Sequence, residues 1–251
     1  MQKLIHLVMD YAPGDLACAE VVSALAAQIP ADYHWHITSV RSFDTVSTGF
    51  VVAQLGNQSE RLRPKDTLIY ANCAPRKDRR EARNNNEGEG FLYGVLNSGV
   101  GIMAVNSGYS LSFVREELKE LWAIKVDVGG SQFRSRDNFP QLVGQAARGE
   151  KDFLIERLDP MRVIAPPPAS AVGYVDSFGN LKTTIREGSP EIANLKPGQR
   201  VTIVINDVEM AATVAAGSFN VQEGDIAFAP GSSGHNRKYW EIFQRGGSAW
   251  H

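Results

Sequence analysis

Residues Gly173 to Ile185 (GYVDSFGNLKTTI) read as a strand, a tight turn and a second strand. Tyr174 before the turn, and Leu181 and Ile185 after it, follow the alternation of apolar and polar positions that is typical of a half-buried strand. The turn itself contains Gly179, which can adopt the positive φ that tight turns often need. This stretch therefore predicts a β-hairpin.

The two edges of this turn carry polar side chains of complementary chemistry. Asp176 offers a carboxylate and Asn180 offers an amide. Such a pair suits the ammonium group and the carboxylate or hydroxyl group of a small zwitterion. An ordinary turn held by an aspartate side chain explains the same residues, and the local sequence leaves both interpretations open.

The rest of the chain after the hairpin is also rich in short alternating segments. Six strands are expected at residues 172–175, 181–185, 200–205, 208–214, 226–229 and 239–244. Asn206 and Asp207 form a suitable hairpin turn between two of them. A proline-rich stretch at residues 165–170 precedes these strands and reads as a linker. We therefore expect a small antiparallel β-barrel domain at residues 171–251.

The first part of the chain has a different pattern of secondary structure. Buried strands are predicted at residues 4–9 and 67–71, and an alternating strand at 34–40. Helices are expected at residues 17–29, 43–55, 111–122 and 138–147, and two further strands at 91–95 and 101–105. This order predicts an α/β fold at residues 1–164, a mostly parallel sheet sandwiched between helices. Ligands of such sheets bind beyond the carboxyl ends of strands, where Asp10 and Asn72 fall.

Composition excludes several classes of protein. The net charge of −2 argues against a general nucleic-acid binder. No apolar stretch is long enough for a transmembrane helix, and no signal segment is visible, so a soluble cytoplasmic protein is expected. The two cysteines and five histidines lack metal-ligand spacing. We therefore expect no metal site, no nucleic-acid partner and no membrane partner.

Four segments, in order, resemble a known family. They are Asp10 with Asp15, residues 133–137 (FRSRD), residues 175–181 (VDSFGNL), and residues 232–234 (SSG) with 239–249 (YWEIFQRGGSA). In this combination the chain resembles the S-adenosylmethionine hydroxide adenosyltransferases and their halogenating relatives, the fluorinases and chlorinases. The match spans most of the chain, and its most specific part is Phe-Gly-Asn at residues 178–180. Residues 235–238 look like an insertion relative to the family.

The resemblance implies an assembly and a set of binding roles. The family pairs an α/β domain with a β-barrel domain and forms homotrimers, with each ligand between the first domain of one subunit and the second domain of the next. It needs no cofactor beyond S-adenosylmethionine as substrate. The implied roles are ribose binding by Asp10 and Phe43, ammonium binding by Asp176 and Asn180, carboxylate binding by Ser232, and adenine binding by Phe219, Gly247 and Ser248. Ordinary core packing is the alternative for the two phenylalanines.

The same resemblance implies a displacement at the ribose C5′, but the usual water-handling trio is altered. The family's aspartate, arginine and histidine correspond here to Asn72, Arg79 and Arg134. Asn72 cannot act as a base, and an arginine is effectively never deprotonated. Ser135 resembles the halide-side serine of the halogenases, whereas Pro75 stands where a fluorinase has a threonine. Water is the expected nucleophile; a halide-using relative and a non-catalytic adenosyl-ligand binding protein are the alternatives.

Overall fold

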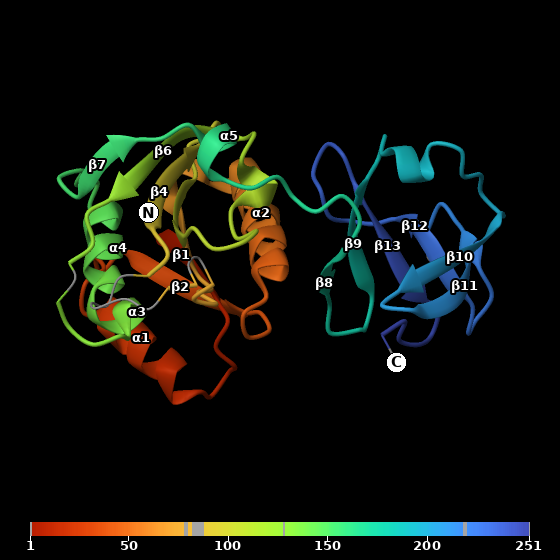
Figure 1. The fold of residues 1–251 in the computed structure, drawn as a ribbon, viewed down its shortest axis with the longest axis horizontal. Coiled ribbons are helices and arrows are strands. Elements are labelled where there is room, and N and C mark those ends of the chain that lie inside the picture. Colours follow the sequence, from red (N-terminus) through yellow and green to blue (C-terminus); the bar gives the residue numbers. More distant parts are fainter. Residues whose placement is uncertain (1, 78–79, 82–87, 128, 218–219, 251) are drawn as a thin grey trace. The chain divides into compact units, whose positions relative to one another are not determined.

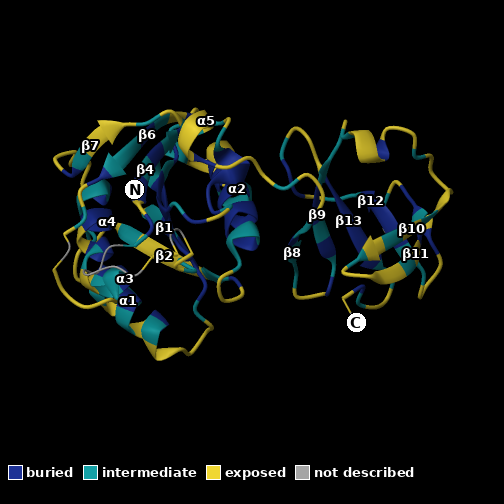
Figure 2. Cartoon of the chain, viewed as in Figure 1, coloured by how far each residue is buried: buried dark blue, intermediate teal, exposed yellow. Residues whose placement is uncertain are grey.

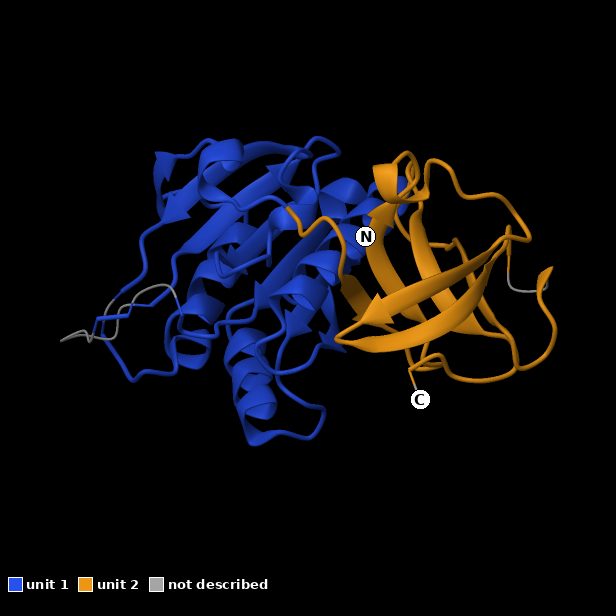
Figure 3. Ribbon diagram, turned by 45° about the vertical axis from the view of Figure 1, so that its right-hand side comes forward, with its two compact units in different colours: residues 1–166 blue, residues 167–251 orange. Residues whose placement is uncertain are grey.

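The computed structural model describes residues 2–77, 80–81, 88–127, 129–217 and 220–250. The chain is a mixed α/β protein with two sheets, and it divides into two compact units, residues 1–166 and residues 167–251 (Figure 3). The boundary falls inside the proline run that the sequence marks as a linker.

Unit 1 contains a seven-stranded mixed sheet. In spatial order its strands are β2 (Tyr33–Ser39), β1 (Lys3–Met9), β3 (Thr67–Asn72), β5 (Gly101–Val105), β4 (Phe91–Leu96), β6 (Leu118–Ile124) and β7 (Leu154–Arg157). The pairs β1–β2, β1–β3 and β3–β5 are parallel, and the other three pairs are antiparallel. The sheet is therefore half parallel, whereas the sequence predicts a mostly parallel one.

Helices cover both faces of this sheet. Helices α1 (Leu16–Ala26), α3 (Arg134–Asp137) and α4 (Phe139–Ala147) pack together on one side, and α2 (Thr45–Leu62) packs against β1 and β3 on the other (Figure 1). A short helix, α5 (Pro160–Val163), and 3₁₀ turns at Pro64–Asp66 and Ser112–Val114 complete the unit. The rings of Phe91 and Phe139 stack 4.1 Å apart in the core, joining β4 to α4.

One helix predicted from the sequence is wrong. Residues 111–122 contain the 3₁₀ turn Ser112–Val114 and most of strand β6 in place of the expected helix. Leu118 and Leu121 are three residues apart, a spacing that fits a helix, yet β6 pairs with both β4 and β7. Tertiary pairing here outweighs local helical spacing. Strand β7 is an element that the sequence reading does not include.

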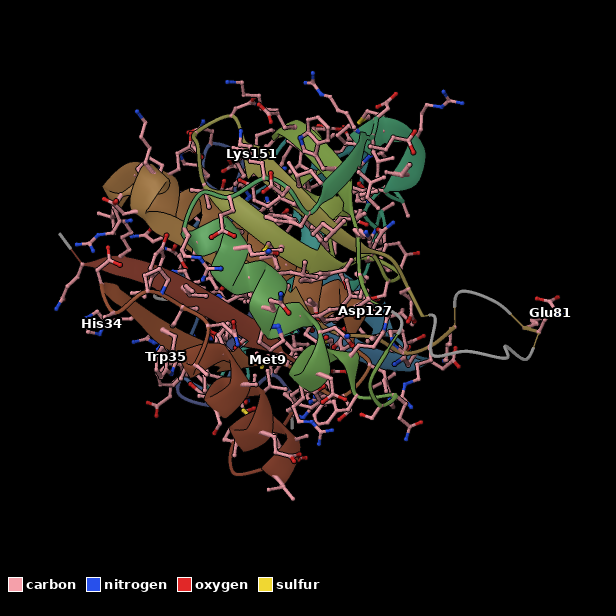
Figure 4. All side chains as sticks on the ribbon, turned by 90° about the vertical axis from the view of Figure 1, so that its left-hand side faces the viewer. Met9, His34, Trp35, Glu81, Asp127 and Lys151 are labelled. Carbon is pink, nitrogen blue, oxygen red and sulfur yellow. The ribbon has the colours of Figure 1, made fainter. Side chains whose placement is uncertain are left out.

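Burial within unit 1 follows the position of each strand in the sheet. Every residue of β3 is buried. Strand β2 lies at an edge of the sheet and is largely exposed (Figure 2). Met9 at the end of β1 is fully buried, and Trp35 of β2 is 40% exposed; both are labelled in Figure 4. In the part of the chain that the structure describes, no helix is long and apolar enough to cross a membrane.

Unit 2 consists of one six-stranded, curled sheet that resembles half of a barrel. In spatial order its strands are β10 (Arg200–Ile205), β11 (Val208–Val214), β12 (Ile226–Pro230), β13 (Tyr239–Gln244), β9 (Leu181–Arg186) and β8 (Val172–Val175). All pairs are antiparallel except β11–β12. Among the described residues the outer strands β8 and β10 do not pair, so this sheet is not a closed barrel.

The two hairpins predicted in unit 2 are both present. Strands β8 and β9 flank the turn at residues 176–180, where Gly179 has φ +78°. Asn206 and Asp207 join β10 to β11 with φ values of +47° and +65°, the positive pair of a two-residue hairpin turn. Phe228 and Trp240, with ring centroids 4.7 Å apart, belong to the core of this unit.

Candidate functional site

Two strand ends of unit 1 bring Asp10 and Asn72 together. Met9, the last residue of β1, lies opposite Asn72, the last residue of β3. The backbone N–H of Asp10 donates to the carbonyl of Asn72 over 3.3 Å. Both residues are buried, with 9% and 3% of their surface exposed. The carboxyl ends of these parallel strands therefore carry a carboxylate and an amide side by side.

The Asp10 carboxylate is held by groups from two other segments. The backbone N–H of Phe43 donates to its Oδ2 over 3.0 Å, and the Cys73 thiol also hydrogen-bonds to it. Burial raises the pKa of the Asp10 carboxyl above its usual value, and these hydrogen bonds oppose that shift. Phe43 takes part through its backbone, at φ +65°, while the residue is 62% exposed. Its ring is therefore not packed in the core, and the core-packing alternative for Phe43 is wrong.

Tyr11 links the other two predicted residues. Its hydroxyl accepts a hydrogen bond from the Asn72 amide (3.1 Å) and lies 2.8 Å from the hydroxyl of Ser135, a residue that is 6% exposed. The ring of Tyr11 packs edge-on against Phe133, with centroids 6.1 Å apart. Burial and the charge of Asp10 raise the pKa of the phenol, so Tyr11 is protonated near neutral pH. Asn72 and Ser135 are therefore joined through a residue that sequence reasoning missed.

Arg134 has a different environment from its neighbour Ser135. Its guanidinium donates to the carbonyl of Glu89 over 2.9 Å and lies over the Phe139 ring, 5.1 Å from the centroid. It also lines a cavity of about 330 Å³ together with Asp127, which is labelled in Figure 4. Arg134 thus has structural partners of its own. Arg79, the retained member of the trio, lies outside the described residues.

Unit 2 has a pocket of about 860 Å³ where three loops meet. Asn180 comes from the turn between β8 and β9, Ser232 from the loop between β12 and β13, and Gly247 from the segment after β13. Lys238, also from the loop between β12 and β13, lines the pocket as well. Three residues to which the resemblance gives binding roles therefore share one pocket. Phe219 lies outside the described residues.

Asp176 is engaged within its own turn. Its Oδ1 accepts the backbone N–H groups of Phe178 and Asn180, each at 3.0 Å, and its Oδ2 accepts the Asn180 side-chain amide at 3.0 Å. Asp176 is also not among the residues that line the pocket. In this structure the carboxylate therefore stabilises the turn and holds the Asn180 side chain in place.

Glu241 is a carboxylate that lines the pocket. It is 7% exposed, and its Oε1 accepts from Lys182 Nζ at 2.8 Å and from the Ser232 backbone N–H at 3.3 Å. Lys182 Nζ is also 3.8 Å from Asp176 Oδ2, so one ammonium lies between two carboxylates. A Cβ at position 231 would overlap the Glu241 side chain, so the glycine at this position leaves room for that side chain. Sequence reasoning gave Glu241 no role, although this residue lies within the segment 239–249 that carries part of the resemblance.

Ser248 packs against the hairpin turn and does not line the pocket. A Cβ at Gly179 would overlap Ser248 Oγ and come within 2.8 Å of its Cβ. The Ser248 hydroxyl is buried and has no hydrogen-bond partner within the described chain. Ser248 therefore supports the turn next to Asn180, which lines the pocket. Among the described residues no group of three or more His, Cys, Asp or Glu side chains could hold a metal ion.

Comparisons with known proteins give information on the fold. No protein-family model matches the sequence, and no curated protein matches it. An uncharacterized conserved protein from Thermotoga maritima is similar, with a TM-score of 0.73 and 18% identity over 98% of this chain and 94% of that one. A conserved hypothetical protein from Thermus thermophilus has a TM-score of 0.67 and 17% identity over 99% and 94% of the two chains. At these identities the likeness establishes a shared fold.

Proposed function

We propose that this protein cleaves S-adenosyl-L-methionine at the ribose C5′ with water, giving L-methionine and adenosine. The observation that carries the proposal is the polar group at the strand ends of unit 1, where buried Asp10 lies beside the linked hydroxyl and amide groups of Tyr11, Asn72 and Ser135. The pocket of unit 2, with Asn180 among its lining residues, supports it. The sequence resemblance names the substrate.

The proposed arrangement is that of the family, an α/β domain followed by a β-barrel domain in a homotrimer. Each ligand would be bound by unit 1 of one subunit and unit 2 of a neighbouring subunit. A closed cyclic assembly is the usual outcome for such an interface. Light scattering tests this point, since a monomer that still binds the ligand contradicts an intersubunit site.

The proposed reaction is a single displacement. The water oxygen forms a bond to C5′, the C5′–S bond breaks, and its electron pair neutralises the sulfonium as methionine leaves. One proton of the water is released to solvent. Because the leaving group is a neutral thioether, no general acid is needed, and the main task of the protein is to align and partly desolvate the nucleophile. The neutral groups around Tyr11 suit alignment of a neutral nucleophile.

The binding role of the polar group can be tested at Asp10. Asp10→Ala removes a buried carboxylate that we assign to the ribose hydroxyls, and it should weaken adenosyl-ligand affinity by about 1.5–3 kcal/mol, the range for a hydrogen bond to a charged group. Asp159→Ala is the matched control, because Asp159 also accepts a backbone N–H, from Met161 at 2.9 Å, but caps α5. Calorimetry showing equal affinities would remove Asp10 from the site.

The chemistry is tested by incubating the protein with S-adenosylmethionine, with and without halide, and identifying the nucleoside by mass. Adenosine supports the proposal, and a 5′-halogenated nucleoside supports the halide-using alternative. Binding without any product supports the non-catalytic alternative. In that case Asn72→Asp with Arg134→His, which restores the family's carboxylate and imidazole, is expected to start adenosine release.

A further inference from the structure

Among the residues that the structure describes, the contacts of Tyr11 leave its hydroxyl with one open position. A phenol has one O–H donor and two acceptor lone pairs. One lone pair accepts the Asn72 amide, and the contact with Ser135 Oγ uses a second position. When Tyr11 donates to Ser135, the remaining lone pair can accept a hydrogen bond from a water molecule. Because that water donates its hydrogen to Tyr11, its oxygen lone pairs stay free to attack the substrate carbon.

We propose that the Tyr11 hydroxyl binds the attacking water, and that Asn72 and Ser135 are positioning residues that act by fixing this hydroxyl. The inference rests on the function proposed above. It assigns the binding of the attacking water to Tyr11. This residue does not belong to the family's aspartate, arginine and histidine trio, which is altered in this sequence.

The surroundings of Tyr11 favour a fixed geometry. Both partners of its hydroxyl are more than nine-tenths buried, so neither can be replaced easily by solvent. The edge-on contact with Phe133 holds the ring from the side, and Phe133 directly precedes the helix that carries Ser135. Anchors from β3 and α3, 61 and 124 residues away in sequence, therefore converge on one oxygen atom. Such preorganisation lowers the entropic part of a barrier.

The protonation of Tyr11 defines what it can do. Because the pKa of the phenol is raised by burial and by the Asp10 charge, Tyr11 keeps its proton at physiological pH. It can therefore orient water but cannot serve as a base for it. Over about pH 6–9 the rate effect of removing this hydroxyl should be constant, whereas the effect of removing a base would change with pH.

The experiment compares Tyr11→Phe with Tyr33→Phe. Both remove one hydrogen-bonded phenol oxygen from unit 1, but Tyr33 donates to the Ala147 carbonyl at 3.2 Å, away from the strand-end group. Tyr11→Phe should lower kcat for adenosine release roughly 10- to 100-fold while KM changes less than about threefold, as expected for loss of a positioning contact. Tyr33→Phe should leave both constants unchanged.

Ser135→Ala provides a second, independent measurement. It should also lower kcat selectively, and it serves the same purpose if Tyr11→Phe fails to fold. If Ser135 acts through the phenol, the double variant should be no slower than Tyr11→Phe alone. Full additivity of the two losses would contradict that role.

The outcomes separate this inference from the proposed function. Wild-type turnover with an unaffected kcat in Tyr11→Phe removes the inference and leaves the function intact. A loss confined to KM also overturns it, because the hydroxyl would then serve binding. Absence of any nucleoside product from the wild type removes the proposed function and this inference together.

Discussion

Gly179→Ala tests how the hairpin turn forms the wall of the pocket in unit 2. The backbone at this position has φ +78°, where a side chain costs about 1–2 kcal/mol. The new Cβ would also overlap Ser248 Oγ, and overpacking of this kind costs about 1–3 kcal/mol. We therefore expect the free energy of unfolding to fall by about 2–5 kcal/mol, the sum of these two ranges.

Two further variants separate the two contributions. Gly198→Ala has the same backbone problem, at φ +85°, but its Cβ meets no atom within 4 Å, so it should show only the backbone cost. Ser248→Gly removes the clash, and in that background Gly179→Ala should cost only about 1–2 kcal/mol. Ser248→Gly should itself be mild, because the hydroxyl it removes has no hydrogen-bond partner within the described chain.

Urea denaturation followed by circular dichroism measures these variants against the wild type. A Gly179→Ala protein that is no less stable than Gly198→Ala would refute the steric explanation. The same holds if Ser248→Gly fails to recover part of the loss, since the coupling between the two positions should be about 1–3 kcal/mol.

Three further predictions concern buried ionisable groups. Lys182→Met should destabilise the protein by about 3–5 kcal/mol in urea denaturation, because it leaves Glu241 and Asp176 without their shared cation, and adding Glu241→Gln should recover part of this loss. Burial and the Asp10 charge raise the pKa of the Cys73 thiol to about 12, so a thiol reagent should modify Cys73 only on unfolding; modification in the native state, detected by mass, would contradict its burial. Because the pKa of Asp10 is raised in the folded protein, its charged form opposes folding. Asp10→Asn should therefore be more stable than wild type above neutral pH and lose this gain below pH 3.8, and equal stability at about pH 8 would count against it.

Local patterns were sufficient for most of the strands. In unit 2 the alternation of side chains and the Asn206–Asp207 turn predicted both hairpins with boundaries that differ from the structure by at most one residue. The helix predicted at residues 111–122 is wrong because apolar side chains three residues apart also fit a helix. The pairing of β6 with its two neighbouring strands depends on residues far away in the chain. Sheet closure and strand direction are also set by such distant pairing.

The candidate site was predictable only where a residue sits at a strand end or in a motif. Asp10 and Asn72 follow buried strands, so their shared edge could be expected from the alternation of strands and helices. Tyr11 could not, because its partners are separated from it by 61 and 124 residues. Glu241 was given no role because its pairing with Lys182 of β9 joins residues that are 59 positions apart, which no local pattern reveals.

Strand β4 runs antiparallel to β5, and this direction determines where the segment between β3 and β4 begins and ends. Because Phe91 and Ala71 flank the end of β5 from opposite sides, the segment between β3 and β4 leaves and re-enters the sheet at the edge that holds Asp10. We expect a chimera that carries another sequence between these two strands to keep the same strand order, because the pairings of β3 and β4 involve no residue of that segment. New chemistry can therefore be grafted at this edge without redesigning the sheet.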